Sequence, residues 1–275
     1  MQDPIEDPIQ SDNDAFVREV HDKGLAYDLP VMTRRRMLTA VGGAGALAVA
    51  GGALLGGSAD PALAACAAEV DSETAGPYPA DGSNGPNVRV LSGIVRSDIR
   101  SSFGTSTTTA PGVPLQFSLT VLNSACTPTV GAAIYAWHCD RAGRYSLYSS
   151  GVTNQNYLRG IQVTNSSGTV TFTSIYPGCY AGRWPHIHFE VYSSLAAATS
   201  ASGLIKKTSQ IALPESVSRT VYASATGYSQ SVTNLSRITL ASDMVFGDDL
   251  AATQMATVTG SVSAGYVANL TITVP

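Results

Sequence analysis

Short runs in which apolar and polar residues alternate recur along the chain from about residue 87 onward. Alternation with a period of two is typical of half-buried strands. Segments rich in Gly, Ser, Thr and Asn, which favour turns, separate the runs. The runs expected to form strands are 87–96, 114–122, 132–138, 170–175, 186–192, 204–213, 218–223, 257–262 and 266–274.

Short strands without intervening helical patterns predict an all-β fold, and specifically an antiparallel β-sandwich. The charged fraction is 13%, which also favours a sandwich or barrel over a helical bundle. Segments 104–112 and 193–202 are expected to be surface loops, and no internal repeat is visible.

The first 65 residues do not resemble part of a folded core. A polar, acidic stretch leads into T-R-R-R-M-L at 33–38, followed by an uncharged Gly- and Ala-rich stretch at 39–58 and a small-residue site at 61–65. These features are typical of a twin-arginine export signal. We therefore expect residues 1–65 to be removed on export and residues 66–275 to form one domain at the cell envelope or outside the cell.

Two alternatives remain for this segment. The apolar stretch is long enough to be an uncleaved membrane anchor, but its Gly content suits a weakly hydrophobic signal, so no stable membrane span is expected after processing. The sequence L-A-A-C at 63–66 also resembles a lipobox, which would make the protein a lipoprotein at Cys66. An oxidising destination makes disulfides reasonable, and three pairings are open to the four cysteines, Cys66, Cys126, Cys139 and Cys179.

The charge balance excludes one class of partner. From Cys66 onward the chain has 11 Lys and Arg and 11 Asp and Glu residues. A near-neutral domain lacks the basic face that phosphate backbones require, so no nucleic-acid partner is expected.

The H-x-H motif at residues 186–188 is the first candidate for chemistry. On a strand, His186 and His188 share one face, while Ile187, Phe189 and Val191 point to the opposite, apolar side. Two imidazoles on one face form half of a metal site, although an ordinary pair of hydrogen-bonded histidines has the same pattern. The scarcity of histidine favours the metal, because residues 66–275 contain only three. A copper or zinc enzyme that uses this pair alone is one alternative.

Tyrosines could complete the ligand set. No third histidine lies nearby, and zinc signatures such as H-E-x-x-H are absent. Tyr145 and Tyr180 stand at turns that flank the H-x-H region. A phenolate is a hard, anionic ligand, and two phenolates with two imidazoles favour Fe(III) over softer divalent ions.

Several sequence blocks occur in the order seen in one enzyme family. They are TAGPY at 74–78, AWHCD at 136–140 with GRYS at 143–146, LRGIQVT at 158–164, TSIYPGCY at 173–180 and GRWPHIH at 182–188. Together they resemble the intradiol ring-cleavage dioxygenases, the family of catechol and protocatechuate dioxygenases. The likeness spans about residues 74–213 and implies the sandwich of that family, with long active-site loops.

The resemblance implies a role for each of seven residues. Tyr145, Tyr180, His186 and His188 would bind one Fe(III) per chain, and Tyr180 would be the axial ligand that substrate displaces. Arg183 would stabilise negative charge on the substrate. Gln210 would lie next to the metal site, and Tyr78 would line the substrate pocket. His138 is expected to be structural.

The implied function is cleavage of catechol-type diols by dioxygen to muconate-type diacids. The alternative from another class is a secreted β-sandwich module that binds aromatic or polysaccharide material, with a structural metal and no turnover. Two departures from the catechol dioxygenases limit the likeness: the loop from Tyr180 to His186 is shorter, and no room exists for a helical dimerisation domain before residue 76. The particular catechol and the oligomeric state stay open.

Overall fold

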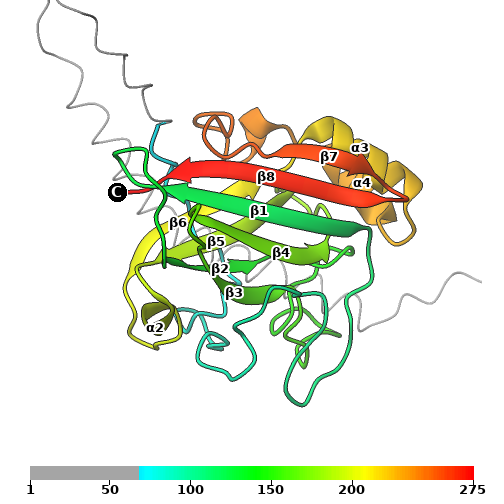
Figure 1. The fold of residues 1–275 in the computed structure, drawn as a ribbon. Coiled ribbons are helices and arrows are strands. Elements are labelled where there is room, and N and C mark those ends of the chain that lie inside the picture. The colour runs from blue at the N-terminus through cyan, green and yellow to red at the C-terminus, as the bar shows by residue number, and fades with distance from the viewer. Residues whose placement is uncertain (1–67) are drawn as a thin grey trace, which may run out of the picture. The chain divides into compact units, whose positions relative to one another are not determined.

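The computed structural model describes residues 68–275, which form two β-sheets (Figure 1). The predicted export signal at 1–65, its cleavage site and the lipidation of Cys66 lie outside the described residues. The predicted fold class is confirmed, because strands dominate and the strand pairs are largely antiparallel.

The first sheet has the strand order β4-β1-β8-β7. β1 pairs with β4 in antiparallel register and with β8 in parallel register, so this sheet is mixed. Its strands are β1 (Pro114–Leu122), β4 (Thr169–Ile175), β7 (Thr257–Ser261) and β8 (Gly265–Thr273).

The second sheet has the order β3-β2-β5-β6 and is antiparallel throughout. In Figure 1 this sheet lies below and behind the first sheet, and its strands rise in the view from β3, the lowest, to β6. Its strands are β2 (Ala133–Trp137), β3 (Arg159–Val163), β5 (His186–Tyr192) and β6 (Ile205–Ala212).

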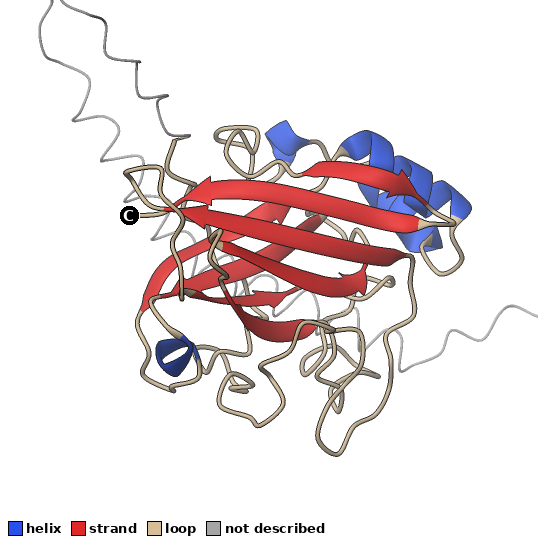
Figure 2. Ribbon diagram, viewed as in Figure 1, coloured by secondary structure: helices blue, strands red, loops and turns tan. Residues whose placement is uncertain are grey.

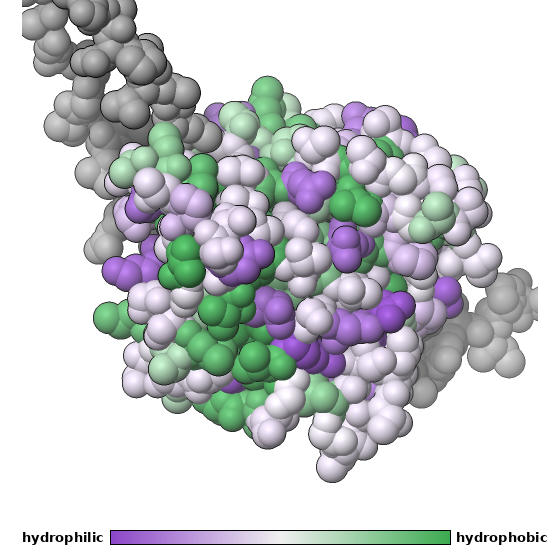
Figure 3. Space-filling model, viewed as in Figure 1, coloured by the Kyte–Doolittle hydropathy of each residue, from purple (hydrophilic) through white to green (hydrophobic). Residues whose placement is uncertain are grey.

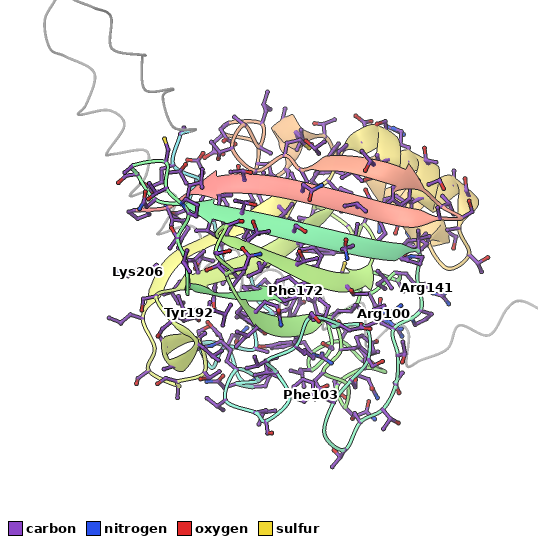
Figure 4. All side chains as sticks on the ribbon, viewed as in Figure 1. Arg100, Phe103, Arg141, Phe172, Tyr192 and Lys206 are labelled. Carbon is purple, nitrogen blue, oxygen red and sulfur yellow. The ribbon has the colours of Figure 1, made fainter. Side chains whose placement is uncertain are left out.

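The main core lies between the two sheets. β1 alternates along its length, so that Leu115, Phe117 and Leu119 enter this core and the residues between them face outward. Figure 4 labels Phe172 of β4 within this layer, and its ring stacks on Phe117 with centroids 5.0 Å apart. Such alternation is typical of a sheet with one buried face.

The two central strands of the second sheet are buried on both faces. Every residue of β2 and β5 is buried. A second cluster covers the outer face, where Tyr135 and Trp137 of β2 pack with residues of the long loops drawn in tan in Figure 2, among them Ala80, Val88 and Tyr145. These loops therefore enclose the face of β5 that carries the histidines.

Few helices accompany the strands. They are α2 (Leu195–Ala198), α3 (Glu215–Ser224), α4 (Ser229–Leu235) and the 3-10 helix η1 (Leu240–Ser242). None of the helices between residues 68 and 275 is long and apolar enough to span a bilayer. The face in Figure 3 mixes hydrophilic and hydrophobic residues, with one hydrophobic area at its lower left.

Some of the expected elements are wrong. Segment 218–223 is not a strand but most of α3, and segment 87–96 forms turns and isolated bridges, interrupted by Gly93 with a φ of 102°. β3 was not expected as a strand, and loop 193–202 contains α2. By contrast, β1 and β5 have the bounds expected from the sequence.

The cysteines differ in their bonding. Cys126 is disulfide-bonded, whereas Cys139 and Cys179 are free and buried. Burial raises the pKa of the Cys179 thiol to about 12. Both free thiols are therefore protonated at neutral pH and are poor nucleophiles.

His138 is a structural residue, as expected. Its Nε2 contacts the Ser174 hydroxyl at 2.6 Å and its Nδ1 contacts the Cys139 carbonyl oxygen at 2.8 Å. Both ring nitrogens are therefore occupied, and the ring is 1% exposed.

The burial of His138 predicts a pH dependence of stability. Burial lowers the pKa of its imidazole from 6.5 to about 4, so the unfolded chain binds this proton more tightly than the folded one. The free energy of unfolding is therefore expected to fall by up to roughly 3 kcal/mol from this group as the pH drops through that window. Denaturant unfolding at several pH values measures it. His138→Gln should show a shallower pH dependence, and equal slopes in both proteins would contradict the assignment.

Candidate metal centre and active site

The two histidines of the H-x-H motif lie on one face of β5. His186 and His188 are each 2% exposed, while Ile187 and Phe189 enter the core between the sheets. The ring of His188 is parallel to the indole of Trp137 on β2, with centroids 4.9 Å apart and an angle of 4° between the planes. Strand periodicity therefore places both imidazoles as expected, and Trp137 fixes the plane of one of them.

Tyr145 lies in the loop between β2 and β3, just after a tight turn. The Asp140 carboxylate organises this turn by accepting hydrogen bonds from the backbone N–H groups of Ala142 and Arg144. It also pairs with the Arg144 guanidinium at 2.8 Å. The turn directs the Tyr145 side chain into the buried space below β5, where it is 2% exposed.

Tyr180 lies in the loop between β4 and β5, which crosses the Tyr145 loop at two glycines. Gly143 has a φ of 83°, and a Cβ there would lie 3.0 Å from the Cβ of Tyr180. A Cβ at Gly178 would lie 2.7 Å from the carbonyl oxygen of Arg141. Only glycine lets the two backbones approach this closely.

Four donor atoms converge where the loops meet β5. The Nε2 atom of His186 lies 3.3 Å from the hydroxyl oxygens of both Tyr145 and Tyr180 and 3.1 Å from the Nε2 atom of His188. The Nε2 atom of His188 lies 3.2 Å from the Tyr145 hydroxyl. Bonds of about 2.0 Å, a usual length for metal–nitrogen and metal–oxygen bonds, bring ligand atoms to about this separation, so the spacing fits a shared metal ion.

The hydrogen bonds fit a metal better than a closed polar network. Nδ1 of His186 contacts the Trp184 carbonyl, which only accepts, so Nδ1 holds the proton and Nε2 presents a lone pair. That single lone pair faces two hydroxyls and a second imidazole nitrogen. Nδ1 of His188 is buried without a hydrogen-bond partner among residues 68–275. A cation shared by the two Nε2 atoms and the two phenol oxygens would engage that lone pair, whereas Nδ1 of His188 lies on the other side of its ring and would not bind it.

The protonation states also suit a metal. Burial lowers the pKa of both imidazoles, and the positive charge of Arg183 lowers it further, so the two rings are neutral. Burial raises the pKa of the Tyr145 and Tyr180 phenols above the usual value, although Arg183 opposes the rise. Ionising two buried phenols therefore requires a strongly charged cation.

No other metal site of the usual kind competes with this one in the described part of the chain. Between residues 68 and 275, no group of three or more His, Cys, Asp or Glu side chains is placed to hold a metal ion. A metal bound by His186 and His188 would therefore take its other ligands from the tyrosines or from solvent.

Arg183 and Gln210 lie beside the four donors. Nη2 of Arg183 donates to Oε1 of Gln210 at 2.7 Å, and Nε donates to Oδ2 of Asp243 at 3.0 Å. The amide nitrogen of Gln210 donates to the carbonyl oxygen of Thr74. The sequence did not identify Asp243 as a candidate. The signal that could have drawn attention to it is its isolation, since it is the one charged residue between Arg237 and Asp248.

Tyr78 forms an aromatic wall next to the site. Its half-buried ring lies 4.9 Å from the ring of Tyr145 and 5.2 Å from that of Tyr148, measured between centroids. Nearby, a Cβ at Gly76, which has a φ of 67°, would lie 3.4 Å from Cε1 of His188. All seven residues singled out from the sequence therefore gather in one region.

Known proteins with similar sequences and structures are dioxygenases. The model of a family described as Dioxygenase matches residues 85–199. A curated relative, chlorocatechol 1,2-dioxygenase of Rhodococcus opacus, is 37% identical over 70 residues, which cover 26% of this chain and 27% of that protein. The matched part of the chain thus spans about a quarter of that relative.

Two solved structures extend the match to most of the described chain. An intradiol ring-cleavage dioxygenase from Tetranychus urticae superposes with a TM-score of 0.59 at 26% identity, covering 76% of this chain and 95% of that one. A second dioxygenase gives a TM-score of 0.56 at 25% identity, with coverages of 76% and 94%. The motifs, the family model and the fold agree, and the described part of the chain is similar to the intradiol ring-cleavage dioxygenases in sequence and in structure.

Proposed function

We propose that the protein is a non-haem Fe(III)-dependent dioxygenase that opens the ring of a catechol between its two hydroxylated carbons. Catechol and dioxygen together give a muconate-type diacid, so both oxygen atoms enter the product and no external reductant is needed. The observation that carries the proposal is the convergence of two phenol oxygens and two imidazole nitrogens at separations of 3.1 to 3.3 Å.

The donor set suits Fe(III) in charge and hardness. Two phenolates would neutralise two of its three positive charges, and with Arg183 nearby the site would stay cationic enough to attract a catecholate. Bound Fe(III) would draw electron density from the chelated diol and make its ring reactive toward dioxygen.

The two tyrosines differ in how freely they can move. Tyr145 is 2% exposed and its ring packs against Tyr78, whereas Tyr180 is only half-buried. Of the two phenols that would hold the metal, Tyr180 is therefore the one that could give way to an incoming diol. Its oxygen would then be free to accept a proton from a substrate hydroxyl, as a local base.

Arg183 supplies a fixed positive charge beside the site. The residue is 5% exposed, and hydrogen bonds hold two nitrogens of its guanidinium. A preorganised cation stabilises negative charge as it develops on the substrate, and such a group typically lowers the activation barrier by a few kcal/mol.

The experiment that tests this function follows colour and oxygen together. Protein loaded with Fe(III) is expected to be wine-red from tyrosinate-to-iron charge transfer. Catechol added without oxygen should shift the absorption band, and admitting oxygen should then consume one dioxygen per catechol and yield the ring-opened diacid. A panel of substituted catechols identifies the preferred substrate.

Other outcomes would overturn the proposal. Colourless protein that binds zinc would contradict the iron site, and extradiol products would contradict the position of ring cleavage. Red protein that consumes no oxygen with any catechol would instead favour the binding module without turnover.

Export through the twin-arginine pathway belongs to the same proposal. It rests on the T-R-R-R-M-L sequence at 33–38 and on the fact that this pathway carries folded proteins, which suits a chain that binds its metal before export. Mass spectrometry of the exported protein should show a new N-terminus near residue 66. A diacylglycerol on Cys66 would indicate a lipoprotein instead.

A further inference from the structure

Asp243 is a buried carboxylate whose two oxygens accept four hydrogen bonds. Oδ2 accepts from Nε of Arg183 at 3.0 Å and from the backbone N–H of Trp184 at 2.6 Å. Oδ1 accepts from the backbone N–H groups of Val245 at 2.8 Å and Phe246 at 3.0 Å. The carboxylate thus joins the loop that carries Arg183 to a turn 60 residues further along the chain.

Asp243 and Gln210 hold different nitrogens of the same guanidinium. Because that group is planar, anchors at Nε and Nη2 fix both its position and its orientation. The ring of Phe246 lies 5.8 Å from the guanidinium carbon and covers it on one side. Gln210 is the cross-strand neighbour of His188, so the fixed cation lies beside the strand that carries the histidines.

Local hydrogen bonds fix the position of Asp243 independently of its contact with Arg183. Thr239 and Ser242 form a capping box around η1. The backbone N–H of Asp243 donates to the Thr239 carbonyl at 2.9 Å. The carboxylate is therefore held by a hydrogen-bonded turn.

The same part of the chain holds the other end of the Tyr180 loop. Ser231 of α4 accepts from the backbone N–H of Cys179 at 2.9 Å, and the side-chain amide of Asn234 donates to the Cys179 carbonyl at 2.8 Å. Residues 231–243 thus anchor the loop just before Tyr180 and again at Arg183.

We propose that Asp243 is a positioning residue for the reaction, because it aligns the Arg183 guanidinium beside the four donor atoms, where the diol would bind. This inference rests on the proposed function. The proposal gives a functional role to a segment outside residues 85–199, which the family model matches, and outside residues 74–213, which carry the sequence motifs. Asp243 does not touch substrate, so it acts only through Arg183.

The test measures turnover per bound iron in the Fe(III)-loaded full chain. Asp243→Asn is expected to keep the red band and lower kcat by roughly 10- to 100-fold, the range typical of outer-shell partners. Both kcat and kcat/KM should fall, because a misaligned guanidinium loses an interaction that it makes mainly in the transition state. If Asp243→Asn does not fold, Asp243→Glu keeps the charge but shifts the guanidinium, and its kcat per iron should fall as well.

A double-mutant cycle separates positioning from general support of the fold. In the Arg183→Met background, Asp243→Asn should cause no further loss of kcat per iron, since its effect passes through Arg183. The matched control is Asp98→Asn, which breaks an exposed Asp–Arg pair with Arg100 and should leave kcat unchanged.

Two results would overturn the inference while leaving the proposed function intact. One is wild-type kcat per iron in the folded variants of Asp243. The other is a full additional loss of kcat in the Arg183→Met background. Failure of the wild-type protein to consume oxygen with any catechol would instead defeat the proposed function, and this inference with it.

Discussion

Replacing His186 with alanine is expected to give a folded, colourless protein that binds no iron and consumes no oxygen with catechol. The Nε2 atom of this residue contacts the three other donors, so its loss opens the centre of the site. Iron affinity should fall by more than the roughly 100-fold that loss of an outer-shell partner can cost. Iron content after gel filtration, the visible spectrum and oxygen uptake measure the effect.

His138→Gln is the matched control for this variant. It removes the one imidazole between residues 68 and 275 that lies outside the H-x-H pair, and whose nitrogens already contact Ser174 and the Cys139 carbonyl. Iron and colour should be retained there. Tyr145→Phe completes the series: unchanged metal content in that variant would contradict a four-donor site and support one built on the histidines alone.

Trp137→Ala is expected to have the largest effect on stability. The indole is fully buried and lies between the rings of Tyr135 and His188, with both centroids 4.9 Å away. Removing it should lower the free energy of unfolding by about 3–5 kcal/mol, as for other large aromatic residues in cores. It should also loosen His188 and weaken iron binding.

Trp137→Phe tests whether the ring or its N–H group matters. The indole nitrogen has no hydrogen-bond partner in the described chain, so a phenyl ring should keep much of the stacking at a smaller cost. Denaturant unfolding and iron titration of both variants measure the difference. Equal losses for alanine and phenylalanine would contradict a stacking role.

The strands were predictable where one physical signal dominated. β1 alternates between buried and outward residues, and β5 is a compact run ended by turns, so both could be recognised with their bounds. Segment 218–223 misled because Val221 and Tyr222 favour strands in isolation. In the structure Ser218, Val221 and Tyr222 are the buried positions of α3, which is helical spacing.

The site was predictable only where a local sequence pattern determines it. The shared face of His186 and His188 follows from strand periodicity, which is local. Tyr145 and Tyr180 reach them from two separate loops, so their placement came from likeness to a family and not from spacing. Asp243 has neither a local pattern nor a motif, because its partner Arg183 is 60 residues away.

The glycine crossing of the two tyrosine loops bears on how tightly a metal would be held. Because Gly143 and Gly178 let the loops meet backbone to backbone, the two phenols are set in place when the chain folds. The conformational entropy of gathering the ligands is then lost during folding and not on binding. Such a preorganised chelate should take up its ion with little rearrangement of the backbone.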